Sequence, residues 1–257
     1  MLVQQPEPNT TSTLNLARGW INTPFFVAAF AGILCFYHVL QWCAHQWSLS
    51  LQRYTLNLMN LSIVLNIRFL AGARYKVYRE HPIPKDRPVI IVSNHQSMYD
   101  IPMMMWELRD RDLGFIAKKE LGKGIPSISY ALRELGSALI DRSDPRQAIE
   151  AISALGHRKE ETKEIAVIFP EGTRARDGKV KSFKLTGFKA LLESMPSAVI
   201  VPVVVTGNWE LLQYNFKPVP AGVSITMQYL PYIEPAGQPA AALLKEIEGR
   251  IRESLES

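Results

Sequence analysis

From Pro88 onward, short apolar runs rich in β-branched residues alternate with segments that have the periodicity of amphipathic helices. The runs predict strands at 88–92, 114–117, 137–140, 164–169 and 198–205, and a strand or hairpin arm within 222–232. The segments between them predict helices that begin near 101 or span 128–135, 145–157, 183–195 and 240–255. This alternation predicts an α/β domain with a mostly parallel or mixed sheet flanked by helices. Such sheets bind ligands at the carboxyl ends of their strands, where functional residues are therefore sought.

The chain before this domain is unusually apolar. Residues 1–13 are polar and we expect them to be disordered. The stretch 20–42 carries no formal charge and is flanked by tryptophans, which is typical of a membrane helix. The next apolar stretch, 56–67, is interrupted by asparagines that cannot all face hydrocarbon, so we expect an amphipathic helix.

These two stretches predict a membrane-associated helical hairpin over 14–72, followed by the α/β domain over 73–257. A single span with an interfacial helix, or two helices of a soluble core, remain alternatives. Basic residues are more frequent after the first stretch than before it, which places the rest of the chain on the cytoplasmic face of the cell's inner membrane.

The net charge, the cysteines and the histidines indicate which kinds of ligand and site to expect. A formal net charge of +5 fits anionic phosphate ligands or a lipid surface better than nucleic acid, and we expect no nucleic-acid partner. Cys35 and Cys43, the two cysteines, would lie about 12 Å apart along a helix, too far for a disulfide. The five histidines form no metal-binding pattern, so we expect no metal site.

His95 and Asp100 lie where the strand at 88–92 hands over to a helix. Five helical steps would point the two side chains to different faces, so they can meet only if His95 precedes the helix and Asp100 lies in its first turn. Pro102 supports that position. A histidine oriented by a carboxylate is suited to act as a general base. Alternatively, Ser97 and Asp100 match a capping box with no role in chemistry.

Three other predicted strand ends carry groups suited to phosphate. Glu171, Gly172, Thr173 and Arg174 follow the strand at 164–169, and the span 171–189 has six basic and two acidic residues. The glycine allows close backbone approach, and the arginine offers a planar fork. Arg142 follows the strand at 137–140, and Lys118 with Lys119 follows the strand at 114–117. The alternatives are a solvated turn for residues 171–174 and a surface ion pair for Asp141 with Arg142.

Four segments together resemble the glycerolipid acyltransferases. The run from Asn94 through Ser97 to Asp100 resembles the first motif of this family, and 136–142, 169–174 and the Val-Pro-Val around Pro202 are similar to the second, third and fourth. They stand in family order over residues 88–206. Ala138 is a mild departure, because a β-branched residue is usual there. The length and the apolar N-terminal hairpin resemble the bacterial 1-acylglycerol-3-phosphate O-acyltransferases.

The resemblance implies acyl transfer from acyl-CoA or acyl-carrier protein to the sn-2 hydroxyl of lysophosphatidic acid, with no cofactor. It implies that His95 is the general base, that Asp100 orients it, and that the three polar turns bind the phosphate. Glu171 is expected to order its turn rather than serve as a second base. Alternatives are Ser97 as a nucleophile, another lysolipid acceptor such as a lyso-ornithine lipid, and a non-catalytic protein that binds anionic lipids.

Overall fold

The computed structural model describes residues 12–134 and 136–256. Its core is a seven-stranded sheet with the order β1-β7-β6-β2-β5-β3-β4. The strands are β1 (Arg74–Arg79), β2 (Val89–Ser93), β3 (Leu113–Lys118), β4 (Ala138–Ile140), β5 (Ile165–Ile168), β6 (Val199–Thr206) and β7 (Ser224–Tyr229). The helices are α1 (Thr13–Trp47), α2 (Leu49–Phe69), α3 (Asp100–Glu107), α4 (Ile128–Glu134), α5 (Pro145–Thr162), α6 (Leu185–Ser194) and α7 (Ala240–Glu256), with 3₁₀ turns η1 (Lys119–Gly122) and η2 (Asn208–Leu212).

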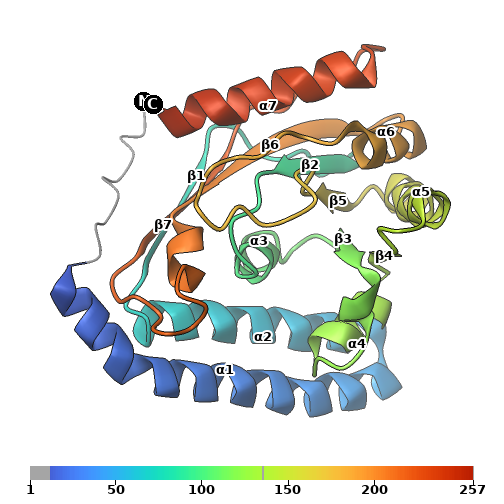
Figure 1. Cartoon of the computed structure of the whole chain (residues 1–257). Helices are drawn as coiled ribbons and strands as arrows, with labels where there is room; N and C mark the ends of the chain where they lie inside the picture. Colours follow the sequence, from blue (N-terminus) through green and yellow to red (C-terminus); the bar gives the residue numbers. More distant parts are fainter. Residues whose placement is uncertain (1–11, 135, 257) are drawn as a thin grey trace.

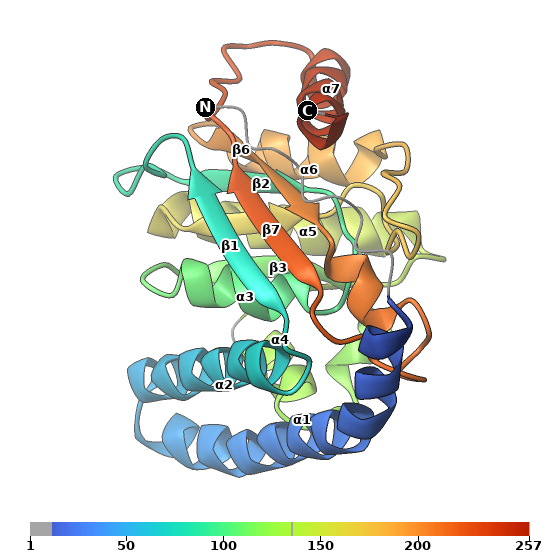
Figure 2. The same cartoon turned by 90° about the vertical axis from the view of Figure 1, so that its left-hand side faces the viewer.

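The sheet is mixed, which confirms the predicted α/β class. Strands β6, β2, β5, β3 and β4 run parallel, whereas β7 pairs antiparallel with β6 and parallel with β1. The carboxyl ends of the five parallel strands therefore lie at the same end of the sheet. Figure 2 shows the remaining two strands, β1 and β7, side by side. Every polar turn singled out in the sequence leaves one of these five strands.

Successive residues of the central strands point to opposite faces, and each face has its own helices. Val89 and Ile91 pack with α3, α2 and α1, whereas Ile90 and Val92 pack with α5, α6 and α7. Figure 1 shows α1 and α2 side by side below the sheet and α7 above it. The central strands are buried on both faces, which explains their continuous apolar runs.

Pro202 lies inside β6 although proline cannot donate to a strand ladder. Antiparallel pairing with β7 covers Val203–Thr206, and Ile200 forms an isolated bridge with Ile233, which lies beyond the end of β7. Pro202 thus sits where the ladder with β7 is interrupted, so its missing N–H is tolerated.

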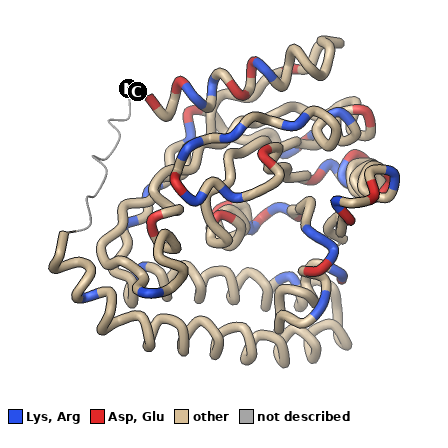
Figure 3. The backbone as a smooth tube through the Cα atoms, viewed as in Figure 1, with Lys and Arg blue, Asp and Glu red and all other residues tan. Residues whose placement is uncertain are grey.

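Helices α1 and α2 form the predicted two-helix segment. Helix α1 begins after Ser12, whose hydroxyl accepts a hydrogen bond from Asn15 N. Of the span 1–13 that we expected to be disordered, Ser12 and Thr13 form the cap and first residue of α1, and residues 1–11 lie outside the described residues. Figure 3 shows both helices almost free of charged residues, and α1 exposes Trp20, Phe25, Phe36, Trp42 and Trp47 among other large apolar side chains.

The asparagines of α2 face the rest of the molecule rather than the exposed side. Asn66 donates to the carbonyl of Phe26, Asn60 is buried with its amide directed to Met105 Sδ, and Asn57 donates to the carbonyl of Arg109. The polar side chains that interrupted the apolar pattern therefore lie on the inner surface of α2, as the amphipathic interpretation requires.

Strand β1 is the element that the sequence pattern did not predict. Its residues, Arg-Tyr-Lys-Val-Tyr-Arg, alternate charged with apolar side chains at an edge of the sheet, and we grouped this span with the basic residues after the hairpin.

Candidate active site

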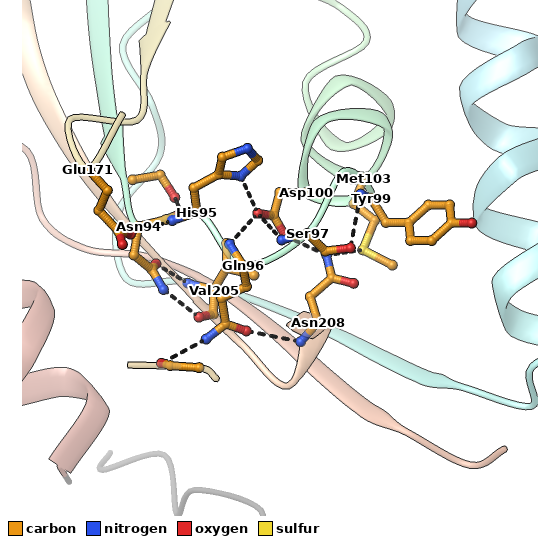
Figure 4. Close-up of polar contacts among 12 residues, drawn as sticks. Asn94, His95, Gln96, Ser97, Tyr99, Asp100, Met103, Glu171, Val205 and Asn208 are labelled. Atoms are coloured by element: carbon orange, nitrogen blue, oxygen red, sulfur yellow. Dashed lines mark hydrogen bonds and ion pairs between the residues drawn. The ribbon is translucent and has the colours of Figure 1, made fainter. Parts of the chain in front are cut away.

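The turn between β2 and α3 brings His95 and Asp100 together. Helix α3 begins at Asp100, so His95 precedes the helix and Pro102 lies in its first turn. His95 Nδ1 lies 2.7 Å from Asp100 Oδ2 (Figure 4). This is the geometry that the spacing of the two residues demanded, and it confirms that they are in contact.

Asp100 is completely buried, and backbone groups fix its carboxylate. Oδ2 accepts the N–H groups of Gln96 at 2.7 Å and Ser97 at 2.9 Å in addition to His95. The predicted capping box is half correct, since Ser97 Oγ accepts from Tyr99 N rather than from Asp100 N, and Tyr99 is the residue before the helix. The carboxylate serves the helix start and the histidine at once, and its charge is stabilised by both.

The His95 ring is held on a second side by Phe169, which stacks on it with ring centroids 4.2 Å apart and an interplanar angle of 21°. Because an ionised Asp100 can only accept, Nδ1 carries the proton and Nε2 has a free lone pair. In the described part of the chain Nε2 has no hydrogen-bond partner, and Figure 4 shows it turned away from Asp100. The ring is partly exposed, so Nε2 can receive a proton from a bound molecule.

Glu171 joins the β5 turn to the backbone of His95. It is buried, its Oε1 accepts His95 N at 2.7 Å, and its Oε2 accepts Lys181 N at 3.0 Å. Burial raises the pKa of the Glu171 carboxyl, and the two backbone N–H groups act in the opposite direction. The carbonyl of His95 in turn accepts Ala175 N at 2.7 Å. These contacts support the expectation that Glu171 orders its turn.

The remainder of this turn presents cations beside the histidine. Gly172 has a φ of +70°, which favours glycine. Lys181 Nζ donates to Thr173 Oγ1 and to the carbonyl of Arg174, so it stabilises the turn. The Arg174 guanidinium is partly buried and has no hydrogen-bond partner among the described residues; burial, with nearby Arg176, lowers its pKa. An unpaired guanidinium in a partly desolvated position is well suited to an anion.

The other predicted phosphate ligands lie farther along the sheet. Strand β3 follows β5 in the sheet, and β4 lies beyond it at the edge. Lys118 forms an ion pair with Glu120, Lys119 lies 4.0 Å from Asp141, and Arg142 is exposed. In the residues that the structure describes, none of the three contacts His95 or the turn after β5. They lie at the same carboxyl end of the sheet as the other site residues, but they do not take part in the hydrogen-bond network of those residues.

Two asparagines at the end of β6 and β2 connect this network across the sheet. Asn94 exchanges two hydrogen bonds of 2.8 Å with the backbone of Val205, which continues the pairing of β2 with β6 by one residue. Asn208, which the sequence analysis did not single out, donates from Nδ2 to Asp100 Oδ1 at 2.5 Å. The signal that could have found Asn208 is its place directly after a buried parallel strand, the same rule that identified the other turns.

No group of three or more His, Cys, Asp or Glu within 12–134 and 136–256 is placed to hold a metal ion. The chemistry available at this site is proton transfer through Nε2 of an oriented histidine, next to a cationic turn.

Known proteins resemble this chain in sequence and in fold. A family model described as Acyltransferase matches residues 74–206. The 1-acyl-sn-glycerol-3-phosphate acyltransferases of Helicobacter pylori and Limnanthes douglasii are both 36% identical, over 133 and 149 residues. These regions cover 51% and 56% of this chain, and 53% and 50% of the relatives, so the chain matches about half of their length.

The structural comparison covers nearly the whole molecule. The crystal structure of the 1-acyl-sn-glycerophosphate acyltransferase PlsC from Thermotoga maritima superimposes with a TM-score of 0.77 at 23% identity. The alignment covers 94% of this chain and 96% of that one, so the fold is shared beyond the region of sequence similarity.

Proposed function

Because the chain belongs to the acyltransferase family, we propose that it transfers a fatty acyl group from an acyl thioester to the sn-2 hydroxyl of 1-acylglycerol 3-phosphate, giving phosphatidic acid. The observation that carries this proposal is the free Nε2 of His95 on a ring whose Nδ1 is held by buried Asp100. The names of the curated relatives support the acceptor.

The reaction needs one base and one leaving-group acid, and His95 serves as both. Nε2 takes the proton of the acceptor hydroxyl as its oxygen attacks the thioester carbonyl. The carbon–sulfur bond then breaks, and the imidazolium returns the proton to the departing thiolate, so an ester and a free thiol are formed. Asp100 stabilises the imidazolium while the reaction passes through it. The donor is acyl-CoA or acyl-carrier protein, since both supply a thioester.

A nucleophilic Ser97 is disfavoured by its surroundings. Its side chain is completely buried, its Oγ accepts from Tyr99 N, and its own N–H is bonded to Asp100. The hydroxyl is directed into the start of α3, so we expect Ser97 to support the turn.

The phosphate of the acceptor is bound by the turn after β5. Arg174 offers an unpaired guanidinium, Gly172 allows close backbone approach, and Thr173 is already oriented by Lys181. Lys118, Lys119 and Arg142 add positive potential from the neighbouring strand ends. Direct binding of the phosphate is thus assigned to the turn that touches His95. Long-range attraction of the phosphate is assigned to the residues at the ends of β3 and β4.

We propose that the apolar hairpin holds this site at a lipid surface. Helix α1 is long and apolar enough to cross a membrane by length and composition, but it packs against the α/β domain along its length, through Phe26, Leu34 and His38. We therefore favour insertion into one leaflet, on the cytoplasmic face.

Trp42→Glu with Phe36→Glu should reduce flotation with phospholipid vesicles several-fold, and unchanged flotation would contradict this placement.

The function is tested with the full chain in phospholipid micelles. Free thiol should appear when lysophosphatidic acid is added with acyl-CoA or acyl-carrier protein, and a parallel panel of lysolipids identifies any other acceptor. His95→Ala should lower turnover by about 10²–10⁴-fold, the usual contribution of a positioned base. His157→Ala is the matched control, because His157 is an exposed histidine on α5. Normal turnover in His95→Ala, or no thiol release with any lysolipid, would overturn the proposal.

A further inference from the structure

The carboxylate of Asp100 has one oxygen that the β2–α3 turn does not satisfy. Oδ2 accepts from His95, Gln96 and Ser97, all within the turn. Oδ1 is equally buried, and its partner is Asn208 Nδ2, 2.5 Å away and 108 residues later in the chain. A buried carboxylate oxygen with no donor would be unsatisfied, so this contact both pairs Oδ1 and fixes the orientation of the carboxylate.

The backbone of Asn208 is held in place as well as its side chain. Gly207, at the end of β6, has a φ of +74°, and a Cβ there would lie 2.0 Å from the carbonyl oxygen of Ser224. The Asn208 N–H donates to Gln96 Oε1 at 3.0 Å, and Gln96 Nε2 reaches the carbonyl of Gly178 in the cationic loop. The side chain is fully buried, so its position is fixed before any substrate binds (Figure 4).

The orientation of the amide indicates what the residue is for. An ionised carboxylate only accepts hydrogen bonds, so Asn208 must turn its NH₂ group toward Asp100. Its carbonyl oxygen, Oδ1, is then buried and has no hydrogen-bond partner. A purely structural asparagine would be expected to satisfy both ends of its amide, whereas this one leaves an acceptor unpaired and keeps the contact with the carboxylate.

We propose that Asn208 is a positioning residue for acyl transfer, which holds the Asp100 carboxylate directed at His95 Nδ1. The inference rests on the proposed function, because it acts through the same histidine. It adds the end of β6 to the site, a strand whose residues do not otherwise touch the pair.

Substitution to leucine removes the donor and keeps the branching at Cγ, although the side chain becomes larger. Asn208→Leu should lower kcat by about 10- to 100-fold, less than loss of the base itself, and leave the KM for lysophosphatidic acid within about twofold. Asn60→Leu is the matched control, since Asn60 is a buried asparagine on α2 with no contact to Asp100 or His95 among the described residues. Thermal unfolding of both variants checks that they fold.

A double-mutant cycle separates positioning from packing. Asn208→Leu should cost no more than about twofold in an Asp100→Ala background, because its effect passes through the carboxylate. Equal losses in both backgrounds, or a loss confined to KM, would overturn the inference. Full activity of Asn208→Leu with an inactive His95→Ala overturns it while the proposed function stands, and full activity of both variants overturns the two together.

Discussion

Two groups of strand ends meet at the same edge of this sheet, and they are built differently. At the centre, the ends of β2, β5 and β6 carry His95, Glu171 and Asn208, which are linked by hydrogen bonds through the buried carboxylates of Glu171 and Asp100. At the side, the ends of β3 and β4 carry the exposed residues Lys118, Lys119 and Arg142. Lys118 pairs with Glu120 and Lys119 lies 4.0 Å from Asp141, so the ion pairs found among the described residues stay within these two strand ends. The centre is thus suited to chemistry that depends on sub-ångström placement, and the side is suited to supply charge that need not be fixed.

This contrast predicts that the centre is sensitive to changes that keep shape and remove charge. Asp100→Asn retains the volume of the carboxylate, but an amide cannot accept from all four donors and cannot stabilise an imidazolium. We expect turnover to fall by about 10²–10⁴-fold, and the unfolding temperature to fall as well.

The control for that experiment is Asp86→Asn, an exposed aspartate before β2. The assay is thiol release at saturating lysophosphatidic acid. An Asp100→Asn protein that is folded and more than half active would contradict the prediction that the central strand ends are the sensitive ones.

A matched pair of arginines distinguishes direct binding of the phosphate from long-range electrostatic attraction. Arg174 is partly buried in the turn after β5, whereas Arg142 is exposed at the end of β4. Arg174→Lys loses the planar fork and should raise the KM for lysophosphatidic acid about 10-fold, with a smaller effect on kcat. Arg142→Lys keeps the charge that it contributes and should change KM by less than about twofold.

Arg142→Ala sharpens the comparison further. If Arg142 acts through the field alone, its removal should raise KM more at low ionic strength than at high ionic strength, because salt screens exposed charges. Equal sensitivity of KM to Arg142→Lys and Arg174→Lys would mean that both arginines bind the phosphate directly.

The smallest predicted effect concerns Glu210 and the pH dependence of the protein's stability. Burial raises the pKa of Glu210, two residues after Asn208, to about 7, and its Oε2 has no hydrogen-bond partner. A carboxyl whose pKa is raised on folding binds more protons in the native state than in the unfolded state. It therefore contributes stability at low pH that is lost as the pH rises from about 4.5 to about 7.

Glu210→Gln removes this titration. The variant should unfold at a temperature closer to that of the native protein at pH 5 than at pH 8, where it should be the more stable of the two. The check is thermal unfolding across this pH range. A difference between the two proteins that does not change with pH would show that Glu210 is not a buried titrating group.

Much of the fold followed from the sequence because its signals are local. The apolar runs, the Asp144-Pro145 start of α5 and the position of Pro102 are each decided by neighbouring residues. The order of the strands is not local, and nothing in the residues of β4 indicates that it lies at the edge, two strands from Glu171. For the same reason the sequence grouped Arg142 with Arg174 as phosphate ligands, although the structure separates them.

The same limit explains what was missed in the site. The contact between His95 and Asp100 could be anticipated because five residues separate them and the helix start fixes their geometry. The contact of Asn208 with Asp100 spans most of the domain and depends on β6 lying next to β2. Strand β1 was missed because its alternating charged side chains are typical of an exposed edge, which a basic segment after a membrane hairpin also fits.

The packing of Tyr99 has a consequence for how this protein can be engineered. Its ring lies edge-on to Phe26 and Phe30 of α1, with ring centroids 6.0 and 5.7 Å away, and the next residue is Asp100. One apolar core contains both α1 and the central strands. The amino-terminal helices are thus part of the folded core and not a detachable segment. A chimera that replaced α1 with an unrelated apolar helix would lose the aromatic packing on Tyr99, the residue next to Asp100.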